Sequence, residues 1–110
     1  MNTEKLKQLA IDALEDLKAT DITVIKITEL TSIADYMIIA SARSSRQLHA
    51  IADHLVQQAK KACEQPRGVE GKTSTNWVLV DLGDVIVHMM MPDTREFYAL
   101  EKLWMPINAN

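Results

Sequence analysis

Gly71, Lys72, Thr73 and Ser74 follow one another in the chain and are residue types that hold phosphate groups in nucleotide-binding loops. That motif requires another glycine five positions before Gly71, and Pro66 stands there instead. It also requires a strand before the loop and a helix after it, whereas this sequence predicts a helix before and a strand after. We interpret the match as chance.

Carboxylates and imidazoles could hold a metal ion or move a proton. Asp81 has no acidic neighbour two residues away, and Asp84 fits a turn. His49 and His54 are five positions apart on a predicted helix, about 140° around its axis, so they cannot easily share a metal. His88 lies on a predicted strand without an evident partner ligand, and we interpret it as a hydrogen-bonded histidine at the edge of a sheet. No metal site is expected.

Candidate nucleophiles are no better supported. Cys63 has no activating charge or base that the sequence identifies, so it is interpreted as a thiol at a helix end. Ser41, Ser44 and Ser45 lack the glycine-flanked turn that exposes a nucleophilic serine. The sequence therefore gives no positive sign of an enzyme, and we expect no cofactor.

Composition restricts the class of protein. The 110 residues are 47% hydrophobic and 25% charged, as in an ordinary globular protein, and we expect residues 1–110 to form a single domain. The net charge of −3 argues against an autonomous nucleic-acid binder. Nothing at the N-terminus reads as a signal peptide, and no apolar run approaches the roughly 20 residues that cross a bilayer. We expect a cytoplasmic protein without membrane contact.

Hydrophobic periodicity divides the chain into helices and strands in the order α-β-β-α-β-β-α. We predict helices over residues 3–19, 44–63 and from 93 onward, strands over 22–27, 35–41, 75–82 and 85–91, and a loop over 65–74. The run over 35–41 is nearly all apolar, which is typical of a strand buried on both faces. This order predicts an α/β fold, a mixed β-sheet with flanking helices.

Two capping boxes are expected to start helices. Ser44 with Gln47 begins the middle helix, and Asp93 with Glu96 begins the last one. The apolar stripe of the last helix, which we expect to pack inward, consists of Phe97, Leu100 and Trp104.

The two last strands form a hairpin around the turn Gly83-Asp84. One face of the hairpin is wholly apolar and consists of Val78, Val80, Leu82, Val85, Val87 and Met89. The other face mixes large apolar groups with an acid and an imidazole, and pairs Trp77 with Met90, Leu79 with His88, and Asp81 with Ile86. Either helices cover this mixed face, or part of it around Trp77 stays exposed and binds another protein.

Charge is distributed unevenly along the chain. Residues 43–72 contain six Lys or Arg against three acids, a net charge of +3, whereas residues 73–110 contain two against five, a net charge of −3. Such segments usually form solvated surface. The acidic C-terminal part also suits a basic protein partner, because complementary charge orients and speeds an encounter.

Four spaced motifs between Asp35 and Trp104 resemble the ribosomal silencing factor family, which is also called the Iojap family. They are Asp35-Tyr-Met-Ile-Ile-Ala-Ser41, Ser44-Ser-Arg-Gln47, Trp77-Val-Leu-Val-Asp-Leu-Gly-Asp-Val-Ile-Val-His88 and Arg95-Glu-Phe-Tyr-Ala-Leu-Glu-Lys-Leu-Trp104. Each motif is weak alone, and the combination is specific.

The resemblance implies a translational repressor without catalytic activity. Proteins of this family bind the large ribosomal subunit through its ribosomal protein number fourteen and block joining of the small subunit when nutrients are scarce. The family fold resembles that of nucleotidyltransferases, but this sequence lacks their Gly-Ser and paired-aspartate signature. The alternative is a degenerate nucleotidyltransferase fold that retains nucleotide binding near Ser41–Ser45 or Asp81. Whether the free protein forms a homodimer stays open.

We predict a partner-binding surface built from Trp77, Asp81, Leu82, His88 and Tyr98, with Trp77 as its apolar anchor. Trp77 and Asp81 project from the mixed hairpin face, Leu82 lies beside the turn, and Tyr98 falls off the apolar stripe of the last helix. The competing interpretation is that Trp77 is a core residue.

Overall fold

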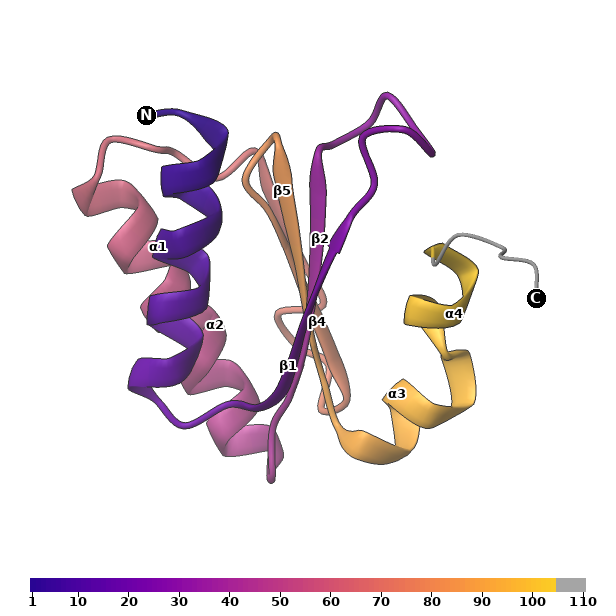
Figure 1. Cartoon of the computed structure of the whole chain (residues 1–110). Helices are drawn as coiled ribbons and strands as arrows, with labels where there is room; N and C mark the ends of the chain where they lie inside the picture. The colour runs from indigo at the N-terminus through magenta and orange to yellow at the C-terminus, as the bar shows by residue number, and fades with distance from the viewer. Residues whose placement is uncertain (105–110) are drawn as a thin grey trace.

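A five-stranded β-sheet runs through the middle of the molecule, with two long helices on one side and two short helices on the other (Figure 1). The computed structural model describes residues 1–104. The elements in chain order are α1 (Thr3–Asp16), β1 (Thr20–Lys26), β2 (Tyr36–Ser41), α2 (Ser45–Lys61), β3 (Gly68–Glu70), β4 (Trp77–Asp81), β5 (Val85–Met90), α3 (Pro92–Tyr98) and α4 (Leu100–Trp104). The prediction of an α/β fold with flanking helices is confirmed.

The sheet is mixed, with strand order β1-β2-β5-β4-β3. The central strands β2 and β5 are parallel, and the other neighbours are antiparallel. Parallel neighbours need a long crossover, and here α2, β3 and β4 all lie between the two strands in sequence. All six residues of β2 are buried, as its apolar sequence predicts.

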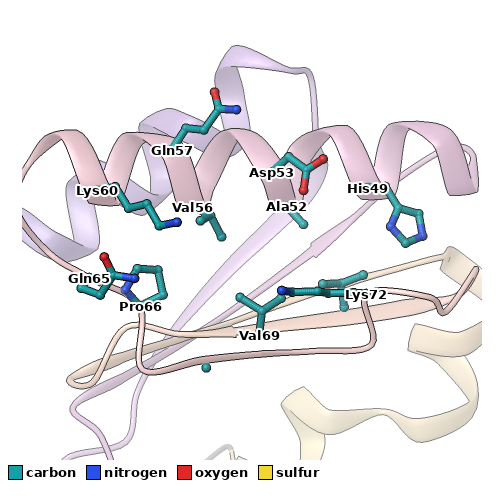
Figure 2. Close-up of a pocket in the computed structure, with 12 residues that line it drawn as sticks. His49, Ala52, Asp53, Val56, Gln57, Lys60, Gln65, Pro66, Val69 and Lys72 are labelled. Atoms are coloured by element: carbon teal, nitrogen blue, oxygen red, sulfur yellow. The ribbon is translucent and has the colours of Figure 1, made fainter.

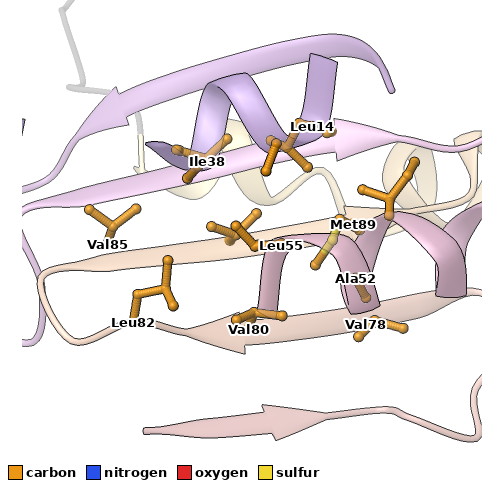
Figure 3. Packing of buried hydrophobic residues seen from close by; sticks show 14 of the residues in the cluster. Leu14, Ile38, Ala52, Leu55, Val78, Val80, Leu82, Val85 and Met89 are labelled. Atoms are coloured by element: carbon orange, nitrogen blue, oxygen red, sulfur yellow. The ribbon is translucent and has the colours of Figure 1, made fainter. Parts of the chain in front are cut away.

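The main hydrophobic core fills the space between the sheet and the helices α1 and α2 (Figure 3). Val80 pairs with Val87 and Val78 with Met89, and all four side chains are buried. The predicted hairpin register and its apolar face are therefore confirmed.

The start of α2 also follows the prediction. The side-chain oxygen of Ser44 accepts a hydrogen bond from the backbone N–H of Gln47 at 3.1 Å. The Gln47 amide in turn donates to the carbonyl of Leu17 at 3.0 Å, which joins the start of α2 to the end of α1. No helix among residues 1–104 is long and apolar enough to span a membrane.

The predicted loop over residues 65–74 contains a strand that the sequence analysis missed. In β3, Val69 pairs with Val80 of β4, so this strand of three residues adds an edge strand to the sheet. Pro66 and Gly71 flank it closely, and these turn-forming residues conceal the short strand in the sequence.

The C-terminal helix differs from the prediction in its start and its continuity. Met91, not Asp93, occupies the N-cap position, and its side chain has no oxygen that could cap the helix. Pro92 in the first turn favours the helix start, because its ring fixes a helical backbone angle. The helix stops at Ala99, whose φ of 47° is left-handed, and α4 begins after it. This break disrupts the periodicity, and Phe97 is exposed instead of packing inward. The side chain of Trp104 lies outside the described part of the structure.

Candidate functional site

The sheet face opposite α1 and α2 is only partly covered. A second, smaller core cluster lies there and consists of Ile25, Ile27, Ala34, Met37, Ile39 and Met90. Trp77, Ile86 and Leu100 pack against this cluster and are partly buried. The short helices α3 and α4 lie on this side of the sheet (Figure 1), and the residues of the cluster are buried. The mixed hairpin face is therefore neither fully buried nor fully exposed.

Three aromatic side chains from β4 and α3 form one continuous surface feature, which we call the aromatic patch and which consists of Trp77, Phe97 and Tyr98. The ring centroids of Trp77 and Tyr98 are 4.8 Å apart, and those of Phe97 and Tyr98 are 5.0 Å apart with perpendicular planes. Phe97 is 81% exposed and Tyr98 is 49% exposed. Aromatic side chains in such number on a surface are typical of protein-binding sites.

His88 forms a hydrogen bond with Trp77 of the aromatic patch. The residue is 6% exposed, and its Nδ1 accepts a hydrogen bond from the indole N–H of Trp77 at 3.0 Å. Because an indole nitrogen only donates, the neutral His88 ring carries its proton on Nε2. Burial lowers the pKa of His88 to about 4, so the ring stays neutral at neutral pH. His88 is hydrogen-bonded as predicted, but β5 is a central strand, so its predicted place at the sheet edge is wrong.

Asp81 and Leu82 lie apart from the aromatic patch. Asp81 shares the face of Trp77 but is four residues away along β4, about 13 Å at the usual rise per residue. Its Oδ1 accepts a hydrogen bond from the N–H of Gly83 at 2.8 Å, which stabilises the hairpin turn. Leu82 is 6% exposed and belongs to the main core on the side of α1 and α2. Of the five predicted site residues, the structure therefore brings together Trp77, His88 and Tyr98.

Arg95 fixes α3 against the sheet, a role that sequence reasoning missed. Its guanidinium donates to the carbonyl oxygen of Asp21 at 2.6 Å, to Oγ of Ser41 at 2.9 Å and to Oγ1 of Thr23 at 2.8 Å. These contacts join α3 to β1 and β2 and set the position from which Phe97 and Tyr98 project. Ser41 is thus a buried partner of Arg95. An arginine in a surface helix gives no sequence signal of such a contact.

The two histidines of α2 have structural partners. The Nε2 atom of His54 lies 2.9 Å from Oδ2 of Asp16, between α2 and α1. His49 forms a hydrogen bond to the carbonyl of Ser74. Within residues 1–104, no group of three or more His, Cys, Asp or Glu side chains is arranged to hold a metal ion.

Comparison with known proteins gives the family. Residues 1–110 match the family described as ribosomal silencing factor during starvation. The ribosomal silencing factor RsfS of Haemophilus influenzae is 46% identical over 99 residues, which cover 90% of this chain and 97% of that protein. A crystal structure of a Chromobacterium violaceum protein has a TM-score of 0.93 and 42% sequence identity, and covers 100% of this chain and 94% of that one.

A more distant relative carries a name that refers to the large subunit. The mouse protein named mitochondrial assembly of ribosomal large subunit protein 1 is 39% identical over 99 residues, which are 87% of this chain and 43% of that protein. The names of the bacterial and the mouse relative describe silencing and assembly of ribosomes, and neither name describes catalysis. The match along the whole sequence shows that this chain belongs to the ribosomal silencing factor family.

Proposed function

We propose that this protein represses translation by binding the large ribosomal subunit through its ribosomal protein number fourteen and preventing the small subunit from joining when nutrients are scarce. The observation that carries the proposal is the family match over residues 1–110. The name of the mouse relative, which refers to assembly of the large subunit, supports the choice of subunit. The protein would act in the bacterial cytoplasm, where the subunits meet.

Repression of this kind needs affinity and bulk but no reaction. The molecule measures 39 × 33 × 20 Å, so a copy held on the joining face of the large subunit would occupy space that the small subunit requires. No bond is made or broken, and the effect lasts as long as the protein stays bound. The strength of repression then depends on the contact surface.

The aromatic patch is the surface that we propose for this contact, with Trp77 as its anchor. Phe97 and Tyr98 present large apolar area to solvent, and burial of such area is the main favourable term in protein association. His88 holds the indole of Trp77 by a hydrogen bond, and Arg95 holds α3 against the sheet. An indole that is already held in place loses little side-chain entropy when it binds, which favours affinity.

Acidic residues near the patch suit a basic partner. Asp93 and Glu96 are exposed on α3, the same short helix that carries Phe97 and Tyr98. Asp81 lies further along the same face of β4 as Trp77. Such charges mainly accelerate and orient the encounter, while the aromatic side chains provide the affinity. Leu82, which lies in the core, would support the fold and make no direct contact.

Sedimentation with separated ribosomal subunits tests the proposal. We expect the purified protein to travel with large subunits and not with small ones, and to reduce the formation of joined ribosomes when it is added first. Binding to small subunits alone, or normal joining at saturating protein, would rule the proposal out. Binding to isolated ribosomal protein number fourteen tests the partner directly.

Phe97→Ala and Trp77→Ala test the surface. Phe97 is so exposed that its truncation should leave the fold intact and weaken subunit binding about tenfold. Loss of a tryptophan anchor typically costs at least about 2 kcal/mol, a factor of roughly thirty in affinity. Ile33→Ala is the matched control, because Ile33 is 70% exposed but lies in the loop between β1 and β2. If a folded Trp77→Ala protein binds as tightly as the parent, the surface is assigned wrongly.

Retained nucleotide binding is the second candidate, because a hollow of about 410 Å³ beside Ser41 has Arg95 and Lys102 in its lining. The two cations could receive a phosphate, but Asp21, Asp93 and Glu96 line the same hollow and oppose an anion, and Arg95 is already bonded to Ser41. Incubation with magnesium and labelled nucleotides separates the candidates. Retention of label that is lost in Lys102→Gln would favour this second function over the first.

A further inference from the structure

The six cations of residues 43–72 lie just before α2, on α2, on the connection to β3 and on the loop that follows β3. All six are exposed, and within the described residues none of them forms an ion pair; they are Arg43, Arg46, Lys60, Lys61, Arg67 and Lys72. By contrast, Lys7 on α1 pairs with Glu4 at 2.9 Å. With the three acids of the same segment included, residues 43–72 carry a net charge of +3, which the net charge of −3 for the whole chain conceals.

A groove of about 570 Å³ lies between α2 and β3 and is lined by two of these six cations (Figure 2). Lys60 lines it from α2 and Lys72 from the loop after β3, and Figure 2 shows Lys72 extended along the groove. Gln57 and Gln65 add side-chain amides to the lining, which we call the basic groove. Asp53 is the acid on its wall.

The walls of the basic groove are held in place and its floor is aliphatic. His49, at one end of the groove, is hydrogen-bonded to the carbonyl of Ser74 and so joins α2 to the loop that carries Lys72. The apolar part of the lining consists of Ala52, Val56, Pro66, Val69 and Val78. Charged and amide donors around an aliphatic floor suit a ligand with anionic oxygens and apolar carbons in alternation, as in a sugar-phosphate backbone.

The basic groove and the aromatic patch lie on opposite faces of β4, the strand next to the edge strand β3. Val78 lines the groove, and the residue before it, Trp77, anchors the patch. Neighbouring residues of a strand point to opposite faces, so the two surfaces are separated by the thickness of the sheet. A partner that contacts the patch and extends around the sheet past residues 77 and 78 would therefore reach the groove.

We propose that the basic groove binds the phosphate backbone of ribosomal RNA that adjoins the protein docked on the aromatic patch. This inference rests on the proposed function, because a ribosomal subunit presents RNA next to its proteins. Phosphate is the anion that Lys60 and Lys72 would meet there, and each contact releases counterions. Docking of the patch raises the effective concentration of RNA at the groove. The excess of acids elsewhere and Asp53 on its wall keep the groove from binding nucleic acid alone.

The double variant Lys60→Gln, Lys72→Gln tests this inference against intact large subunits and against isolated ribosomal protein number fourteen. We expect unchanged affinity for the isolated protein and a three- to tenfold loss of affinity for the subunit. The slope of log affinity against log salt should become shallower by about one to two, since each phosphate contact contributes about 0.7 to 0.9. Lys60→Arg, Lys72→Arg should retain the parental values.

The matched control is Lys5→Gln, Lys26→Gln, which removes the same charge from exposed lysines on α1 and β1. It should bind the subunit like the parent. Parental affinity and salt dependence in the Lys60, Lys72 double variant would overturn the RNA contact. Equal weakening toward the isolated ribosomal protein would overturn it too, because the groove would then touch protein. If the parent binds neither target, the proposed function itself fails.

Discussion

We expect the free energy of unfolding to fall as the pH is lowered from 6.5 to about 4, because His88 is buried as a neutral ring. Protonation would place a charge at a site that is 6% exposed. A proton on Nδ1 would also oppose the indole N–H of Trp77, which now donates to that atom at 3.0 Å. Between these two pH values the His88 ring therefore stays neutral in the folded protein, whereas it is protonated in the unfolded chain.

The expected size of the effect follows from the pKa of His88, which burial lowers from 6.5 to about 4. Each pKa unit corresponds to 1.36 kcal/mol. Once His88 is fully protonated in the unfolded chain but still neutral in the folded protein, the free energy of unfolding is therefore lower by roughly 3 kcal/mol. Between these two pH values the unfolded chain binds more protons, so stability rises with pH. The contribution of the neutral His88 ring to stability is complete above pH 6.5 and is lost as the pH falls toward 4. Domains of this size are stable by roughly 5–15 kcal/mol, so the change is large.

Urea unfolding at several pH values from 4.5 to 7.5 measures this effect in the parent and in His88→Gln. A glutamine oxygen can accept the indole hydrogen bond but cannot titrate. We expect the parent to lose about 2–3 kcal/mol over this range and the variant to keep a nearly flat profile. An NMR titration of the His88 ring gives its pKa directly. Equal pH dependence in both proteins, or a ring pKa of 6 or above, would refute the reasoning.

Three further variants probe the core, the clamp on α3 and a tight turn. Val80→Asp buries a charge at a fully buried position, so it should cost several kcal/mol and abolish cooperative melting by circular dichroism; parental melting would mean that the hairpin faces are reversed. Arg95→Met should lower thermal stability by about 2–3 kcal/mol and weaken subunit binding, since α3 loses its contacts with β1 and β2; unchanged values of both would contradict the clamp. Gly71→Ala should destabilise by about 1–3 kcal/mol in chemical unfolding, because φ is +84° and a Cβ would lie 2.3 Å from a carbonyl oxygen. Its control, Gly68→Ala, has no atom within 4 Å of the new Cβ and should cost less.

The sequence predicts best where one periodic signal and one turn determine a structure. In the β4–β5 hairpin, alternation gives the faces and the two-residue turn at Gly83 gives the register, so the pairing of Val80 with Val87 could be stated in advance. The start of α2 at Ser44 follows from the local capping signal. Both features depend on residues that are near one another in sequence.

The rest of the candidate site depends on contacts that sequence patterns do not encode. Arg95 lies 54 positions from Ser41 in sequence, and no pattern near either residue indicates their hydrogen bond. Phe97 looks like an inward residue until the left-handed backbone at Ala99 interrupts the helix. The burial of Leu82 could have been inferred from its place on the apolar hairpin face, because that face forms the main core.

The parallel pairing at the centre of the sheet has a consequence for synthesis of the protein. Tyr36 pairs with Val85, which is 49 positions later in the chain. Because β5 fills the middle of the sheet, a nascent chain that has not yet released residues 85–90 from the exit tunnel lacks the strand that joins β2 to β4. Such long-range pairing is slow to form, so folding waits for nearly the whole chain. We therefore expect no incomplete chain to silence ribosomes, and the protein to become active only after its own translation is nearly finished.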